Sequence, residues 1–214
     1  MRAADISGYY FITDSKLSRF GNLYDVTQAV SAGVNIVQYR NKAGTTKELY
    51  AEAVKLCEIC RKGKTLFIVN DRLDISMAVG AHGVHIGQDD MPLSEARRLL
   101  GAAKIIGVTA HSVKEALSAQ RAGADYIGVS PIFATATKHD AGKPAGIELI
   151  NKVKKAVKIP IVAIGGINLK NAVSVVTVGA DCLCAVSAVV ASNDPKAQII
   201  KFQQLFKKTA GSRQ

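Results

Sequence analysis

Residues 67–90 decide the fold, and they read FIVNDRLDISMAVGAHGVHIGQDD. The runs FIV and VHI are short and apolar, so each predicts a buried strand, and the segment between them has helical spacing. Acidic residues follow both strands: Asp71 follows the first, and Asp89 and Asp90 follow the second. If the two strands are parallel neighbours, their carboxylates project from the same end of one sheet. The stretch therefore predicts a strand–helix–strand unit able to hold a divalent cation, which prefers oxygen ligands.

The same alternation of strand and helix continues in both directions along the chain. Predicted strands cover residues 9–12, 36–40, 66–69, 84–86, 105–108, 126–129, 161–164 and 182–186. Predicted helices cover residues 22–32, 45–62, 73–79, 92–100, 112–122, 147–157, 168–178 and 194–207. Eight such units in 214 residues match a (β/α)8 TIM barrel better than an open sheet. We therefore predict an α/β fold with one barrel domain over residues 1–214, frayed from about residue 208.

Local signals mark the ends of these predicted helices. Thr45 with Glu48, and Ser112 with Glu115, have the spacing of a capping box, and Pro92 suits a first helical position. A recurring glycine pattern ends a helix and opens the next strand. It occurs as Gly33-Val34-Asn35, Gly80-Ala81-His82, Gly123-Ala124-Asp125 and Gly179-Ala180-Asp181.

The four cysteines predict neither disulfides nor a metal centre. Cys57 and Cys60 form a CxxC pattern, but they lie on the apolar stripe of a predicted helix, and Cys182 and Cys184 alternate within a predicted strand. The stripe consists of Leu49, Ala53, Leu56, Cys57 and Cys60. The N-terminus lacks the apolar core of a signal peptide, and no apolar run is long enough for a membrane span. We expect a cytoplasmic protein with no membrane partner.

The net charge of +11 raises the question of nucleic-acid binding. However, the chain has no basic run of five or more residues, no tryptophan and no aromatic residues interleaved with a basic patch. A solvated basic surface that attracts small anionic substrates is the favoured interpretation, and no nucleic-acid partner is expected.

Polar residues cluster where the predicted strands end, which is the reaction face of such a barrel. They are Gln38, Arg40, Lys42, Asn70, Asp71, Asp89, Asp90, Thr109, His111, Ser130, Thr135, Thr137, Lys138, Gly165, Gly166 and Ser187. Acids beside several cations suit a metal-bound diphosphate, in which the acids hold the cation and the basic groups neutralise phosphate oxygens. Glycines after the seventh strand and Ser187 after the eighth suit a phosphomonoester.

Simpler interpretations exist for individual residues. Asp71 alone suits a helix N-cap, Gly165-Gly166 suits a turn, and Arg40 and Lys42 suit solvated loop positions. His85 alternates with apolar neighbours inside a strand and is interpreted as a packed histidine or a support for a site residue. The joint placement of the polar residues on one barrel face favours the functional interpretation.

A set of motifs then covers nearly the whole chain. They are Gln38-x-Arg40-x-Lys42, Asn70-Asp71-Arg72, GVHIGQDD at 83–90, GVTAHS at 107–112, Ser130-Pro131-Ile132-Phe133 followed by Thr135-x-Thr137-Lys138, and AIGGI at 163–167. In this order, on eight strand–helix units, they resemble the thiamine-phosphate synthase family. Thr109 stands where serine is frequent in that family, Ser130 where glycine is frequent, and His82 where an acid is commoner.

The resemblance implies a transferase that joins hydroxymethylpyrimidine diphosphate to hydroxyethylthiazole phosphate, giving thiamine phosphate and pyrophosphate with Mg²⁺ as cofactor. It implies that Asp71 and Asp90 ligate the metal, and only the family pattern selects Asp90 over Asp89. It assigns catalytic and diphosphate contacts to Arg40, Lys42 and Lys138, with Asn70 as a further diphosphate contact. Its other substrate contacts are Gln38 and Thr109 for the pyrimidine, and Thr135, Thr137, Gly166, Val186 and Ser187 for the thiazole phosphate.

Two other functions stay open at this point. A thiazole tautomerase of the same barrel family would keep the phosphate site without needing the diphosphate site. A non-catalytic phosphate- or nucleic-acid-binding protein is the alternative that the charge suggests. The retained acids and cations favour the synthase, which acts on two small anionic substrates and is compatible with a homo-oligomer.

Overall fold

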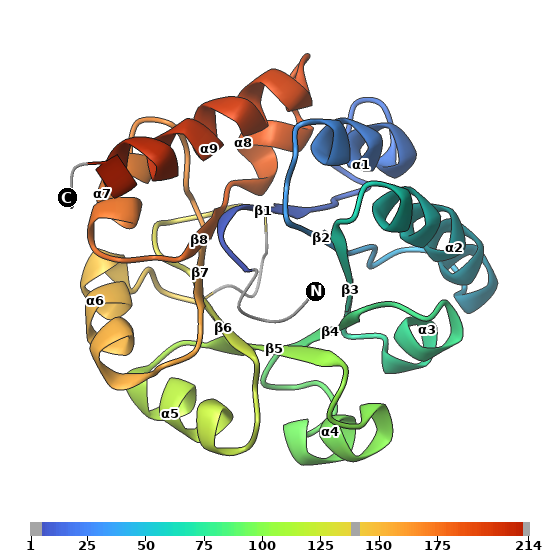
Figure 1. Ribbon diagram of the computed structural model, residues 1–214, viewed down its shortest axis with the longest axis horizontal. Helices are drawn as coiled ribbons and strands as arrows, with labels where there is room; N and C mark the ends of the chain where they lie inside the picture. Colours follow the sequence, from blue (N-terminus) through green and yellow to red (C-terminus); the bar gives the residue numbers. More distant parts are fainter. Residues whose placement is uncertain (1–5, 138–141, 212–214) are drawn as a thin grey trace.

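Eight parallel strands close into a barrel, and helices surround it (Figure 1). The computed structural model describes residues 6–137 and 142–211, with side chains described as far as residue 207. The strands are β1 (Gly8–Ile12), β2 (Ile36–Tyr39), β3 (Leu66–Asn70), β4 (Gly83–Ile86), β5 (Ile105–Ala110), β6 (Tyr126–Val129), β7 (Ile161–Ile164) and β8 (Cys182–Cys184). Each strand pairs with the next in sequence, and β8 pairs with β1, which confirms the predicted fold class.

The helices follow the strands in turn and cover the outside of the barrel (Figure 1). They are α1 (Asn22–Ser31), α2 (Thr46–Lys62), α3 (Leu73–Ala78), α4 (Leu93–Leu100), α5 (Val113–Arg121), α6 (Gly146–Ala156), α7 (Ala172–Thr177), α8 (Val186–Val190) and α9 (Pro195–Gly211). No helix in the described ranges is both long and apolar enough to cross a membrane.

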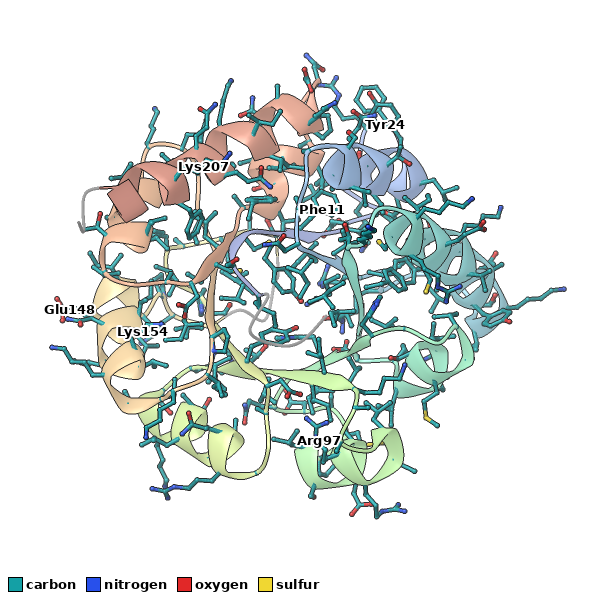
Figure 2. All side chains as sticks on the ribbon, in the orientation of Figure 1. Phe11, Tyr24, Arg97, Glu148, Lys154 and Lys207 are labelled. Atoms are coloured by element: carbon teal, nitrogen blue, oxygen red, sulfur yellow. The ribbon has the colours of Figure 1, made fainter. Side chains whose placement is uncertain are left out.

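The core has two layers because strand side chains alternate between the two faces of the barrel wall. Along β1, Tyr10 and Ile12 belong to the inner cluster. Tyr9 and Phe11 belong to the outer cluster between the barrel and its helices. Phe11 is labelled in Figure 2. The stripe on α2 that contains Cys57 and Cys60 is buried in this outer layer as predicted. All four cysteines are free and buried.

The structure corrects several predicted boundaries. The last strand ends at Cys184, and a short helix, α8, that was not predicted follows it. Pro92 is the N-cap of α4 rather than its first helical residue. The final helix continues to Gly211, past the predicted end at Lys207, and residues 212–214 lie outside the described part. Thr45 and Glu48 form the predicted capping box.

The recurring glycine pattern lies at the end of the barrel where strands begin. Asp125 accepts a hydrogen bond from the backbone nitrogen of Ile106 at 2.7 Å, and its carboxylate also pairs with Arg97 at 2.6 Å. Asp181 repeats the arrangement with the nitrogen of Ile161 and with Lys154. In the second copy of the pattern, His82 replaces the acid.

The ring of His82 performs the same task as those acids. Its Nδ1 accepts a hydrogen bond from the backbone nitrogen of Phe67 at 3.0 Å. Burial, followed by the nearby Lys104 ammonium, lowers the pKa of His82. The third residue of the pattern therefore joins adjacent strands at the base of the barrel, and His82 does so in its neutral form.

Candidate functional site

A cavity of about 300 Å³ opens at the carboxyl ends of the strands. Residues that end or follow all eight strands line it, as expected for the reaction face of a barrel. It contains every predicted site residue within the described ranges: Gln38, Arg40, Lys42, Asn70, Asp71, Asp90, Thr109, Thr135, Thr137, Gly166, Val186 and Ser187. Lys138 lies outside the described residues, so its assignment stays a prediction.

Two carboxylates from neighbouring strands meet on one side of this cavity. Asp71 follows β3, and its backbone nitrogen donates to the carbonyl of His85 on β4 at 2.8 Å. Asp90 accepts from the backbone nitrogen of Gly87 at 2.7 Å, and its carboxyl lies within hydrogen-bonding reach of Asp71. Burial and the Asp71 carboxylate raise the pKa of Asp90. Asp89 also lines the cavity, but it is exposed, and it is Asp90 whose carboxyl interacts with Asp71, so geometry distinguishes the two members of the acidic doublet.

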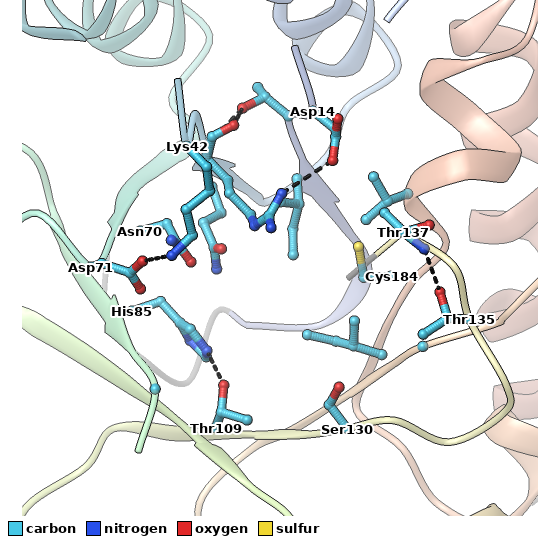
Figure 3. A pocket seen from close by; sticks show the side chains of 18 of the residues that line it. Asp14, Lys42, Asn70, Asp71, His85, Thr109, Ser130, Thr135, Thr137 and Cys184 are labelled. Carbon is cyan, nitrogen blue, oxygen red and sulfur yellow. Dashed lines mark hydrogen bonds and ion pairs between the residues drawn. The ribbon is translucent and has the colours of Figure 1, made fainter. Parts of the chain in front are cut away.

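Asp71 is not a helix cap. Its backbone has a positive φ of 58°, which is uncommon for a residue other than glycine. The N-cap position of α3 belongs to Arg72, with no side-chain capping bond. The N-cap interpretation of Asp71 is therefore wrong. Its carboxylate instead forms an ion pair with the ammonium of Lys42 (Figure 3).

The acid pair fits a magnesium ion. Magnesium is usually held by one or two carboxylates together with substrate phosphates and water. Asp71 and Asp90 supply two carboxylates, and the pKa of Asp90 is raised mainly by burial and further by the neighbouring Asp71 carboxyl. The described residues contain no cluster of three or more His, Cys, Asp or Glu side chains suited to a metal. Asp71 and Asp90 are therefore the residues that could hold such an ion.

Arg40 is held over the cavity by the end of β1. Its Nη1 lies 3.1 Å from Oδ2 of Asp14, and its backbone nitrogen donates to Oγ1 of Thr13 at 2.8 Å. The other oxygen of Asp14 accepts from the backbone nitrogens of Lys16 and Leu17, which fixes the carboxylate. Thr13 and Asp14 are cavity residues that were not predicted from the sequence. Their position directly after the first strand was the signal that could have identified them.

The opposite side of the cavity carries Thr135 and Thr137 (Figure 3). The backbone nitrogen of Thr137 donates to Oγ1 of Thr135 at 3.2 Å. Val186 and Ser187 begin α8, whose first N–H groups have no partner within the helix. A short extra helix after the eighth strand is a common part of the phosphate site in barrels of this kind.

Gly165 and Gly166 have a structural reason to be glycine. Both have positive φ values, 103° and 63°. A Cβ on Gly165 would lie 2.8 Å from Pro131, and one on Gly166 would lie 2.4 Å from the carbonyl oxygen of Ala134. The turn interpretation is therefore correct for both residues. The same turn also lines the cavity, so the two interpretations are compatible.

His85 supports the floor of the cavity. It is 5% exposed, and its Nε2 lies 2.9 Å from Oγ1 of Thr109 (Figure 3). This confirms its interpretation as a packed histidine that supports a site residue. His111, one of the polar residues predicted on the reaction face, lines the cavity and places Nδ1 2.5 Å from the carbonyl oxygen of Ser130.

Comparisons with known proteins identify the family of this chain. The family model described as thiamine monophosphate synthase matches residues 9–189. A thiamine-phosphate synthase from Methanosarcina barkeri is 52% identical, with 94% of this chain and 91% of that protein covered. A thiamine-phosphate synthase from Methanosarcina mazei is 50% identical, with 95% of this chain and 85% of that protein covered. A solved structure of thiamine phosphate pyrophosphorylase from Pyrococcus furiosus has a TM-score of 0.88 at 35% identity, with 96% and 98% covered. The chain therefore belongs to the thiamine monophosphate synthase family.

Proposed function

We propose that this protein is a thiamine-phosphate synthase that joins hydroxymethylpyrimidine diphosphate to hydroxyethylthiazole phosphate. The products are thiamine phosphate and pyrophosphate. One observation carries the proposal: a single cavity has paired acids and cations on one side, and threonines with the first turn of α8 on the other. Such a cavity offers two distinct anion sites, as a reaction between a diphosphate and a phosphomonoester requires.

The diphosphate side stabilises the leaving group. Arg40 and Lys42 contribute two positive charges, Asn70 contributes an amide, and Lys138 is assigned to the same task by family resemblance. Asp71 and Asp90 would hold Mg²⁺, which when bound supplies positive charge to the departing diphosphate. The Asp14–Arg40 ion pair keeps the guanidinium oriented before the substrate arrives.

The pyrimidine lies between the two anion sites in this proposal. Its amino group can stabilise a methylene cation once the diphosphate leaves. The thiazole nitrogen carries no proton, so its attack needs no general base. The residues accordingly provide charge neutralisation and alignment rather than a nucleophile–base pair. Gln38 and Thr109 are assigned to the pyrimidine.

The thiazole phosphate is assigned to the other side. Thr135 and Thr137 contribute hydroxyl groups, and Ser187 contributes a hydroxyl and a backbone N–H. Gly166 and Val186 complete this wall of the cavity. A cytoplasmic place of action fits the four free, buried cysteines, because disulfides form in oxidising compartments.

A coupled assay tests the proposed function. Purified protein with Mg²⁺ and both substrates is expected to release pyrophosphate and to form thiamine phosphate in equal amounts. Reactions that omit either substrate are the controls. Binding of thiazole phosphate without any product would contradict the synthase and would favour the tautomerase. A salt-sensitive gel shift with random DNA would support the binding-protein alternative.

A further inference from the structure

A continuous chain of hydrogen bonds crosses the barrel interior beneath the cavity. The amide nitrogen of Gln38 donates to the hydroxyl of Tyr10 at 2.8 Å. The hydroxyls of Tyr10 and Tyr126 are 2.7 Å apart, and Tyr126 lies 3.0 Å from Nδ1 of His85. The chain ends at Thr109, 2.9 Å from Nε2 of His85. Both ends line the cavity, whereas the two tyrosines are fully buried below it.

Two glycines make room for the rings in this chain. A Cβ on Gly107 would lie 2.0 Å from Cζ of Tyr126, and a Cβ on Gly128 would lie 3.0 Å from Cε1 of His85. Neither glycine has a positive φ, so space rather than backbone conformation accounts for them. The barrel wall therefore leaves room for the rings of the hydrogen-bond chain, which argues against the interpretation that these contacts are incidental.

Counting hydrogens gives the chain a direction. Burial raises the pKa of Tyr10 and of Tyr126, so each hydroxyl keeps one hydrogen to donate. With the Gln38 amide donating, Tyr10 donates to Tyr126, Tyr126 donates to Nδ1 of His85, and Nε2–H of His85 donates to Thr109. If Tyr126 instead donated to Tyr10, the hydroxyl hydrogen of Tyr10 would have no acceptor among the described residues.

This direction determines which hydrogen-bonding groups the two ends of the hydrogen-bond chain present to the cavity. The carbonyl oxygen of Gln38 remains as an acceptor, and the hydroxyl of Thr109 remains as a donor. Turning the Gln38 amide over would put its oxygen on Tyr10 and would reverse each following bond. The two ends are therefore coupled, because a donor at one end requires an acceptor at the other.

We propose that Tyr10, Tyr126 and His85 are positioning residues that make the site select an aminopyrimidine over its deaminated counterpart. This inference rests on the proposed function. The amino group donates to the oxygen of Gln38, and a ring nitrogen accepts from Thr109. In the deaminated compound a carbonyl replaces the amino group and faces the oxygen of Gln38. Binding of the deaminated compound therefore requires reversal of the whole hydrogen-bond chain or leaves polar groups unpaired.

Equilibrium binding of the two pyrimidine diphosphates, without the thiazole substrate, tests the proposal. The wild-type protein is expected to prefer the aminopyrimidine, and Tyr10→Phe and Tyr126→Phe are each expected to lower that preference roughly tenfold. The affinity for inorganic pyrophosphate is expected to stay unchanged, because the substituted hydroxyls lie outside the cavity lining. Tyr9→Phe is the matched control. Tyr9 is also buried, but its hydroxyl donates to the carbonyl of Ala185 and takes no part in the hydrogen-bond chain.

The possible outcomes separate this inference from the proposed function. Failure of the wild-type protein to bind the aminopyrimidine diphosphate contradicts the proposed function itself. Normal binding with undiminished preference in both tyrosine variants contradicts only the inference. Nitrogen NMR of the wild-type protein adds a test that needs no variant. It is expected to show His85 protonated on Nε2 and not on Nδ1, and the opposite tautomer would overturn the proposed direction.

Discussion

The carboxylate of Asp14 lies 3.1 Å from the guanidinium of Arg40, although the two residues are far apart in the sequence. Asp14 is nearly buried and is also fixed by two backbone hydrogen bonds. The arrangement limits the orientations that Arg40 can adopt over the cavity. The orientation of the positively charged Arg40 therefore depends on the negatively charged Asp14.

Asp14→Asn is expected to weaken use of the diphosphate substrate. Asparagine keeps an oxygen for the backbone nitrogens of Lys16 and Leu17, but its amide cannot form an ion pair with Arg40. We expect the KM for the pyrimidine diphosphate to rise about tenfold, with a smaller change in the KM for the thiazole phosphate. Steady-state kinetics with each substrate varied separately would show this. Glu95→Gln, which breaks an exposed ion pair with Arg98, serves as the control.

Asp71→Asn and Asp90→Asn are each expected to reduce turnover by about a hundredfold or more, because each removes a proposed carboxylate ligand. Asp89→Asn is the matched control, since Asp89 is the exposed neighbour in the same doublet. Turnover at several Mg²⁺ concentrations provides the measurement. Equal losses in the Asp89 and Asp90 variants would contradict the assignment.

Lys42→Met is expected to have opposite effects on the binding of metal and on the binding of diphosphate. The Lys42 ammonium is paired with Asp71, so it competes with a metal for that carboxylate. Removing it should tighten Mg²⁺ binding to the free protein severalfold, because the pair is partly exposed and its energy is modest. It should also weaken the binding of inorganic pyrophosphate in the presence of Mg²⁺. Calorimetric titrations would measure both, and weaker Mg²⁺ binding by the free variant would refute the competition.

His82 is expected to make the fold sensitive to acid. Its pKa is lowered in the folded state, so the unfolded chain binds the proton more readily. The free energy of unfolding should therefore decrease as pH falls below about 6.5, until the folded state also takes up the proton. His82→Asp introduces the acid that stands at this position in two other copies of the pattern, as Asp125 and Asp181, and should remove this dependence. Urea unfolding at several pH values would measure it, and a wild-type curve that is flat between about pH 7 and pH 5 would contradict the prediction.

Gly107→Ala is expected to destabilise the protein by about 3 kcal/mol, because the added methyl group overlaps the Tyr126 ring. Gly128→Ala should cost less, since its nearest atom, on His85, is 3.0 Å away. Thermal unfolding of both variants tests this order. A Gly107→Ala protein as stable as the wild type would show that the ring has room to move.

Much of the site could be predicted from the sequence because a barrel brings the ends of all its strands to one face. Once eight strand–helix units are recognised, residues such as Gln38, Asn70 and Thr109 must lie near one another, whatever their separation along the chain. Local patterns were equally informative for the α2 stripe and for its Thr45–Glu48 capping box. These features depend on periodicity and on short-range hydrogen bonds, which a sequence displays directly.

Other features depend on contacts across the barrel, and only the tertiary structure decided them. Spacing did not distinguish Asp90 from Asp89, but the fold turns Asp90 toward Asp71 and leaves Asp89 exposed. Helix α8 is too short to show a helical pattern, yet it changes Val186 and Ser187 from a strand end to a helix start. The chain from Gln38 to Thr109 joins side chains of five strands, and its order follows from which inward-facing rings meet. The sequence by itself determined the barrel and the face on which the site lies. Side-chain packing inside the barrel determined which polar atoms meet there, because no local pattern encodes contacts between distant strands.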